Sequence, residues 1–95
     1  MPEYARVVRF DATGDALDAL VNEINAAEGP PEGVDATRII VLADRAAGHV
    51  TVAVRFASEE AMKKGGAVLE AMSPSEGLTR VSVDELEVVL ERVAP

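Results

Sequence analysis

Cysteine and tryptophan are absent from this chain of 95 residues, and only Tyr4, Phe10 and Phe56 are aromatic. Without cysteine the chain can form neither a disulfide nor a thiolate metal site, and it has no thiolate nucleophile. A chain without disulfides suits the reducing cytoplasm, which is where we expect this protein. With so few aromatic side chains, the core must consist mainly of Val, Leu, Ile and Ala.

Histidine and basic residues are also scarce. His49 is the only histidine, so one subunit cannot build a metal site from several histidines, and the sequence pattern supports no Ser-His-Asp triad. We therefore expect no metal and no cofactor. Nine Lys and Arg residues against 17 Asp and Glu residues give a net charge of −8, which disfavours binding to nucleic acid or to anionic membranes.

Long apolar segments are missing as well. Residues 1–4 lack the basic region and apolar run of a signal peptide. No apolar run approaches the roughly 20 residues that a membrane-spanning helix needs, so we expect no membrane segment. The length suits a single domain over residues 1–95.

The chain does contain a short repeat. The tripeptide Val-Arg-Phe at residues 8–10 recurs at residues 54–56. Each copy ends a strand-like run, and a capping residue and a helix-like segment follow it directly. The repeat therefore predicts a strand–helix–strand unit that is used twice.

Two helices are expected, one after each copy of the repeat. An apolar stripe at helical spacing ends before Gly29 and predicts a helix over residues 14–28. Ser58 and the two glutamates after it predict the start of the second helix. Gly65 and Gly66 inside this second helix indicate local bending or tight packing.

The other segments are strand-like. Apolar runs predict strands over residues 4–10, 37–43 and 50–56, with a hairpin loop at residues 44–48. The last segment, residues 79–93, allows two interpretations. It is either a strand with a β-bulge near Asp84 and Glu85 or a helix capped by Ser82. The repeated unit requires a final strand, so we favour the strand.

Two such units in succession predict an α+β, ferredoxin-like βαββαβ fold, in which a four-stranded antiparallel sheet carries two helices on one face. We expect the first and third strands to be parallel central neighbours with the same facing. The other face then exposes apolar residues of the outer strands. Because burying one Val, Leu or Ile side chain is worth about 1.5–3 kcal/mol, we expect a homodimer through this helix-free sheet face.

Three segments carry a family resemblance: YARVVRF at residues 4–10, SEEA at residues 58–61 and SVDELEVV at residues 82–89. With the predicted fold, they resemble the dimeric α/β-barrel superfamily, and within it the small antibiotic-biosynthesis-monooxygenase-like proteins. The resemblance implies a ferredoxin-like homodimer. It does not extend to the axial histidine of the haem-degrading members, because residues 61–72 contain no histidine, nor to the tryptophan of the polyketide-tailoring oxygenases.

Four residues are candidates for a site. Arg9 and Arg55 are expected close together on the helix-free face, where two guanidinium groups can hold a carboxylate or a phenolate. The alternative, which we favour, is that both pair with Asp or Glu across the dimer. Arg6 and Tyr4 are expected on the helix side, at the rim of a small-molecule pocket between the sheet and the helices.

No motif assigns a catalytic residue, so three functions remain open. We favour a homodimeric α/β-barrel protein that binds a small molecule. The first alternative is a cofactor-independent monooxygenase acting on an aromatic quinol or anthrone, with Arg9 or Arg55 stabilising a phenolate or enolate. The second alternative is a structural dimerisation module.

Overall fold

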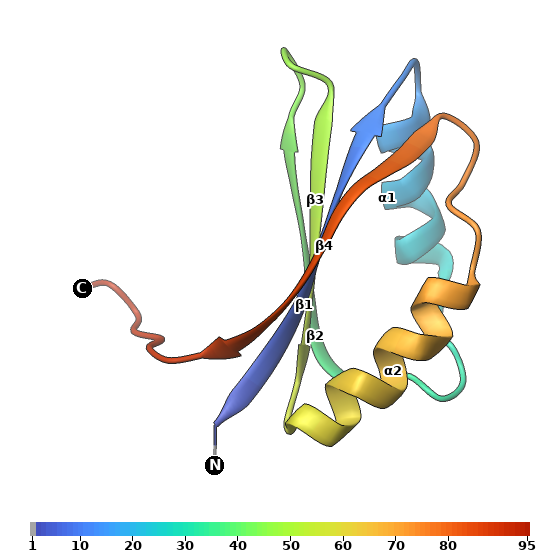
Figure 1. The fold of residues 1–95 in the computed structure, drawn as a ribbon. Helices are drawn as coiled ribbons and strands as arrows, with labels where there is room; N and C mark the ends of the chain where they lie inside the picture. Colours follow the sequence, from blue (N-terminus) through green and yellow to red (C-terminus); the bar gives the residue numbers. More distant parts are fainter. Residues whose placement is uncertain (1) are drawn as a thin grey trace.

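The computed structural model describes residues 2–95 and shows two strand–helix–strand units in succession (Figure 1). The elements are β1 (Glu3–Ala12), α1 (Ala16–Ala26), β2 (Ala36–Asp44), β3 (His49–Phe56), α2 (Glu59–Ala71) and β4 (Leu78–Val88). The strands form one antiparallel sheet in the order β2-β3-β1-β4, and both helices lie on one side of it (Figure 1). This arrangement confirms the predicted α+β, ferredoxin-like fold. Within residues 2–95, no helix is long and apolar enough to cross a membrane.

The two central strands, β1 and β3, are antiparallel, so the expected parallel pairing was wrong. Tyr4 lies opposite Phe56 and Val8 lies opposite Val52. The direction follows from the topology: β3 returns through a tight hairpin from β2, and β2 runs in the same direction as β1 after the crossover through α1. The prediction that matching residues of β1 and β3 lie on the same face of the sheet is nevertheless correct, because residues opposite each other on paired strands project on the same side.

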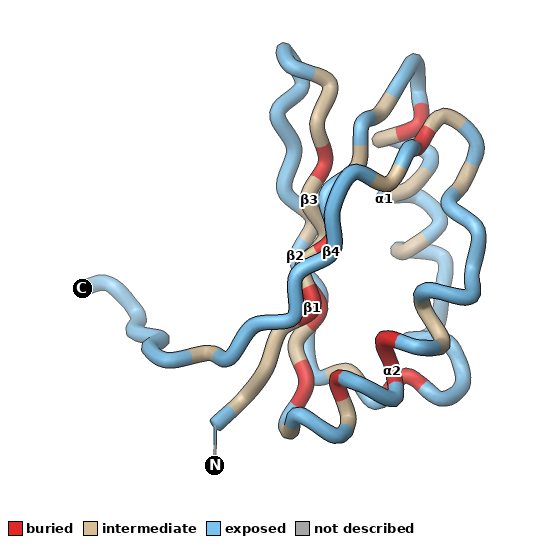
Figure 2. The backbone as a smooth tube through the Cα atoms, in the orientation of Figure 1, coloured by how far each residue is buried: buried red, intermediate tan, exposed pale blue. Residues whose placement is uncertain are grey.

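The best-packed part of the core lies between β3 and α2. Phe56 is completely buried there, in a cluster with Val34, Val54 and Met62. Gly65 allows this contact, because a Cβ atom at this position would lie 2.7 Å from Cε1 of Phe56. The two glycines of α2 thus serve close packing on the sheet, and the helix runs through them uninterrupted. Figure 2 shows the buried positions along β1, β3 and the sheet-facing side of α2.

Helix α1 is held less firmly than α2. Its only buried residue is Ala16, whereas Leu17, Leu20 and Ile24 of its apolar stripe are half-buried and Val21 is exposed. Asp15, the N-cap residue, makes no side-chain capping hydrogen bond, unlike Ser58 of α2, whose Oγ accepts from the Ala61 amide at 3.1 Å. A capping hydrogen bond of this kind typically contributes about 1 kcal/mol. The apolar stripe of α1 is therefore only partly buried.

Strand β4 is a strand, as favoured, but it ends at Val88 rather than at residue 93. Its β-bulge lies at Val81, because Ser82 pairs with Arg9 while Arg80 pairs with Phe10; the expected position near Asp84 was wrong. In the sequence of β4, the apolar residues change from odd to even positions. The reason is that they lie on different faces of the sheet in the two halves of the strand. Val83 lies opposite Val8 on the helix side, whereas Leu86 and Val88 lie on the helix-free face.

Residues 89–95 follow β4 without regular secondary structure and extend away from the helices (Figure 1). We call residues 89–95 the C-terminal segment. Its apolar residues are almost fully exposed, with Leu90 at 81% and Val93 at 92% of their maximal accessible surface. Nothing within residues 2–95 covers them, so this segment adds to the apolar surface on the helix-free side.

Candidate functional site

The four predicted site residues separate onto the two faces of the sheet as expected. Tyr4 and Arg6 lie on the helix side, and Arg9 and Arg55 lie on the helix-free face. Arg9 and Arg55 are not close together, however. Arg9 lies opposite Thr51 and Arg55 lies opposite Ala5, so four residues, or about 13 Å along the strand, separate them. The antiparallel pairing places the two copies of the repeat at opposite ends of the sheet.

Arg55 is engaged with acids, as favoured, but the acids belong to its own chain. Its Nη2 donates a hydrogen bond to Oε1 of Glu3 at 3.2 Å, and its Nη1 donates to Oε2 of Glu91 in the C-terminal segment. The side chain is only 12% exposed. These contacts make Arg55 a structural residue that ties the C-terminal segment to the sheet.

Arg9 is exposed and borders a hollow of about 270 Å³ on the helix-free face, near the β2–β3 hairpin. The hollow is lined by Arg9, Leu42, Ala43, Asp44, His49 and Thr51. His49, the first residue of β3, pairs there with Asp11, with 2.9 Å between Nδ1 and Oδ1. This hollow belongs to the face that we expect a second subunit to cover.

Arg6 has the most unusual surroundings of the four. It is 5% exposed and is the only buried charged residue among residues 2–95. Gly66 of α2 makes room for it, because a Cβ atom on Gly66 would lie 3.3 Å from Cδ of Arg6. Yet Nη2 of Arg6 is buried without a hydrogen-bond partner in the described part of the chain. Most buried polar groups in proteins are hydrogen-bonded, so this nitrogen requires an explanation.

The electrostatics around Arg6 also disfavour its charge. Burial lowers the pKa of the Arg6 guanidinium, and the nearby cation of Arg80 lowers it further, while Glu70 and Glu85 act in the opposite direction. Glu85 itself accepts a hydrogen bond from Nζ of Lys63 at 2.9 Å, and this bond raises the pKa of Lys63. Neither Glu70 nor Glu85 makes a hydrogen bond to Arg6.

Sequence reasoning missed Arg80, the second basic residue of this site. Its Nη2 donates to the carbonyl oxygen of Met72 at the long distance of 3.5 Å, and its Nε is buried without a partner among residues 2–95. The bulge at Val81 is the reason that Arg80 faces the helices, because it sets Arg80 opposite Phe10 on that side. A regular strand would have turned Arg80 toward the helix-free face. The misplaced bulge therefore hid this residue.

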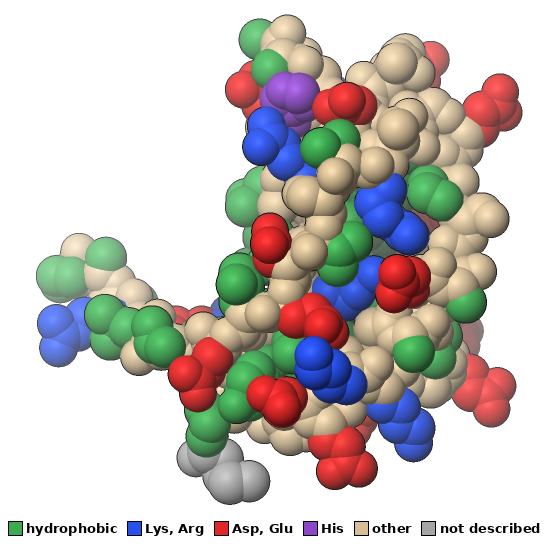
Figure 3. Space-filling view, in the orientation of Figure 1, with side chains coloured by type: hydrophobic (Ala, Val, Ile, Leu, Met, Phe, Trp, Pro, Cys, Tyr) green, Lys and Arg blue, Asp and Glu red, His purple; other side chains and the backbone are tan. Residues whose placement is uncertain are grey.

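Tyr4 lies two residues before Arg6 on the same face and packs against the cluster around Phe56. Partial burial raises the pKa of its phenol, and the charges of Glu59 and Glu87 raise it further. Tyr4 therefore stays protonated at neutral pH and can donate a hydrogen bond at the edge of the site. Figure 3 shows Lys and Arg side chains grouped between β4 and the helices, with Asp and Glu side chains beside them.

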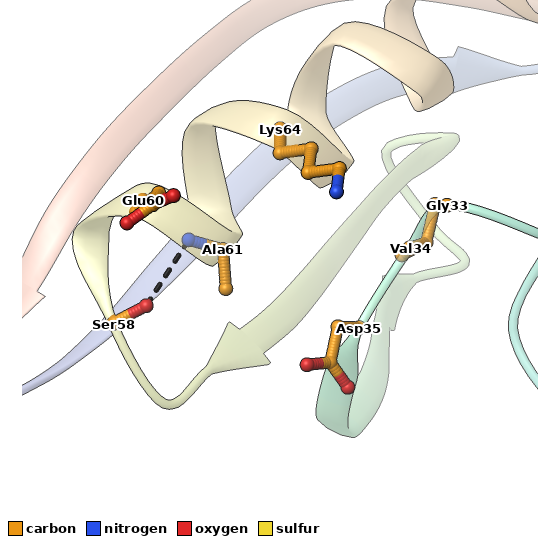
Figure 4. Close-up of a pocket in the computed structure, with 7 residues that line it drawn as sticks. All are labelled: Gly33, Val34, Asp35, Ser58, Glu60, Ala61 and Lys64. Carbon is orange, nitrogen blue, oxygen red and sulfur yellow. Dashed lines mark hydrogen bonds between the residues drawn. The ribbon is translucent and has the colours of Figure 1, made fainter.

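A second hollow, of about 410 Å³, lies between the loop that leads into β2 and the N-terminal part of α2 (Figure 4). It is lined by Gly33, Val34, Asp35, Ser58, Glu60, Ala61 and Lys64. The Ser58 hydroxyl is occupied in capping α2, and none of these side chains has a buried polar atom without a partner. The hollow therefore offers less to a ligand than the surroundings of Arg6.

The residues described hold no group of three or more His, Asp or Glu side chains that could bind a metal ion. No family model, curated protein or solved structure matches the chain. The family resemblance noted in the sequence therefore stays a prediction.

Proposed function

We propose that this protein is a homodimer that binds a small molecule between its helices and its sheet, with Arg6 as the anchor of the ligand. The observation that supports this proposal is the burial of Arg6 with Nη2 unpaired. A charged group taken out of water without a full set of partners costs several kcal/mol. A polar group of a ligand beside Nη2 would offset this cost.

The surroundings of Arg6 suit a ligand as well. Binding sites for small molecules are mostly apolar and contain a few polar groups that fix the orientation. Here Arg6 lies against Gly66 of α2. The half-buried stripe of α1, with Leu17, Leu20 and Ile24, leaves apolar surface to be covered on the same side of the sheet. Tyr4 can add one hydrogen-bond donor.

The helix-free face supports the dimer. Ile40, Leu42 and Leu86 are exposed on it, each to at least 41%. The C-terminal segment adds Leu90 and Val93 beside this face. Burying each such side chain is worth about 1.5–3 kcal/mol, and a second copy related by a twofold axis is the simplest cover. We also propose a cytoplasmic location, in keeping with the absence of cysteine.

The ligand site can be tested by a thermal-shift screen with a library of small polar metabolites, followed by ¹⁵N NMR titration of each hit. We expect a hit to raise the melting temperature and to shift the amide signals of Arg6 and Gly66. The Arg6→Gln variant should lose the effect, while Lys64→Gln, at the other hollow, should keep it. A screen without any ligand at this position would contradict the proposal and favour a structural dimerisation module.

A second candidate function is a cofactor-independent monooxygenase acting on an aromatic quinol or anthrone. The same buried cation favours it, because a guanidinium in apolar surroundings stabilises a phenolate or enolate. Oxygen consumption with a panel of hydroquinones and anthrones tests this candidate. Turnover that falls in Arg6→Gln would support it, and no turnover above the uncatalysed rate would exclude these substrates.

A further inference from the structure

Two guanidinium groups on the helix side of the sheet each keep one buried nitrogen without a partner. These nitrogens are Nη2 of Arg6 and Nε of Arg80. The two side chains come from neighbouring strands, since β1 and β4 pair along their length. Arg80 lies opposite Phe10, four residues along β1 from Arg6, and both side chains project on the helix side; the cation of Arg80 lowers the pKa of Arg6. Two like charges that act on each other in this way favour a bound anion between them.

Glu85 lies opposite Arg6 on the helix side, but no carboxylate among residues 2–95 forms a hydrogen bond with Arg6 or Arg80. Glu85 is hydrogen-bonded to Lys63, and Glu70 is exposed on α2. Neither forms a hydrogen bond with Arg6 or Arg80. Within residues 2–95 the lack of an acid hydrogen-bonded to these arginines is notable, because the chain has a net charge of −8 and 17 Asp and Glu residues.

We infer that the ligand carries one carboxylate, which accepts hydrogen bonds from both Arg6 and Arg80, and an apolar body that packs against α1. This inference rests on the proposed function and names the class of its ligand. Two free donors, one from each guanidinium, match the two oxygens of a single carboxylate. The half-buried side chains of Leu17, Leu20 and Ile24 provide the apolar surface for the rest of the molecule.

Helix α1 also explains how such a ligand enters. Both free nitrogens are closed to solvent in the structure, so an element of the cover has to move. Segments with few buried apolar contacts open at the lowest free-energy cost. Helix α1 buries only Ala16 and lacks a side-chain cap, whereas α2 is fixed by Met62, Gly65 and Gly66. Movement of α1 would open the helix side of the sheet beside α2 and leave the packing around Phe56 intact.

The inference can be tested with octanoate, octanamide and inorganic phosphate as probes. Binding is measured by isothermal titration calorimetry and located by ¹⁵N NMR at Gly66 and in α1. We expect octanoate to bind at least about tenfold more tightly than octanamide, the factor that corresponds to one charge-assisted hydrogen bond. Arg80→Gln should weaken octanoate by a similar factor. Arg38→Gln, which removes an exposed guanidinium from β2, should leave it unchanged.

The outcomes separate this inference from the proposed function. If octanoate and octanamide bound equally tightly at Gly66, the claim that the ligand needs a carboxylate would be wrong, but the proposal that the site binds a small molecule would stand. If phosphate bound as tightly as octanoate, the claim that the ligand has an apolar body would be wrong. Octanoate binding that is unaffected by Arg80→Gln would remove Arg80 from the site. If none of the probes binds while another library compound shifts Gly66, the ligand class is wrong and the function stands; if no compound binds, both fail.

Discussion

At the scale of single residues, the two copies of Val-Arg-Phe show how position in the fold decides the role of a side chain. Arg9 and Arg55 lie on the same face, as the alternation of a strand predicts, yet Arg55 is nearly buried between two acids and Arg9 is exposed. Alternation fixes which face a residue occupies. It contains no information on strand direction, so the sequence could not tell that the two arginines lie at opposite ends.

Arg6 and Tyr4 were predictable as residues of the helix side, and the structure agrees. The burial of Arg6 was not predictable, because an arginine at an alternating strand position is usually covered only along its stem. It follows from Gly66, four residues and about one turn after Met62 on α2, which lets the helix approach the Arg6 side chain. In the sequence, the pair Gly65 and Gly66 indicated tight packing of the second helix, but it did not show which residues the helix packs against.

The close approach at Gly65 leads to a prediction about stability. A Cβ atom at Gly65 would lie 2.7 Å from the ring of Phe56, which is completely buried and cannot move away freely. We expect Gly65→Ala to lower the free energy of unfolding by about 1–3 kcal/mol, although alanine favours the helix by about 1 kcal/mol. Urea denaturation measures this change.

Gly29→Ala is the matched control for this substitution. A Cβ atom there would meet no other atom within 4 Å, so the free energy of unfolding should change by less than about 0.5 kcal/mol. If Gly65→Ala proved as stable as this control, the packing of α2 on Phe56 would not be as tight as described.

At the scale of elements, the order of helices and strands was predictable because each has a clear period or a clear boundary. The first and last residues of α1 and β4 were less predictable. Helix α1 begins at Ala16 and ends at Ala26 instead of spanning residues 14–28, and β4 ends at Val88. The bulge at Val81 could not be placed from the sequence, because a bulge and a change of the covered face produce the same break in alternation.

Helix α1 should be the least protected of the regular elements. It buries only Ala16, and protection from hydrogen exchange follows local burial and packing. We expect the central amides of α1 to exchange at least about tenfold faster than those of α2 in the ligand-free protein. Hydrogen–deuterium exchange followed by NMR measures both in one sample, so α2 serves as the internal control. Equal protection of the two helices would contradict the role of α1 as the movable cover.

At the scale of the whole molecule, the two faces of the sheet have different tasks. The helix side holds the core and the two arginines, and the helix-free face presents apolar side chains of β2 and β4 together with the C-terminal segment. Exposed apolar patches of this kind usually mark an interface. The sequence predicted this division from the alternation of the strands, although dimer formation itself stays a prediction.

The dimer predicts a specific effect of charge on the helix-free face. Light scattering at micromolar concentration should give twice the chain mass of 10.0 kDa. Leu42 is 58% exposed in one chain, so Leu42→Asp should leave the monomer folded and shift the equilibrium toward it. Ala67→Asp, at an exposed position of α2, introduces the same charge and should keep the dimer. If the wild-type protein were monomeric under these conditions, the prediction of an interface on the helix-free face would be wrong.

The central claim, that Arg6 is an unpaired buried cation kept for a ligand, is tested most directly by the stability of Arg6→Met without any ligand. Replacing a poorly compensated buried charge by an apolar side chain of similar length is often stabilising, so we expect the free energy of unfolding in urea to rise by about 1 kcal/mol or more. Arg55→Met removes an arginine that has two ion pairs, although its Nε is also buried without a partner, and should instead lose about 1 kcal/mol at the same protein concentration. A loss of stability in Arg6→Met as large as that in Arg55→Met would show that Arg6 is a structural residue and would contradict the account.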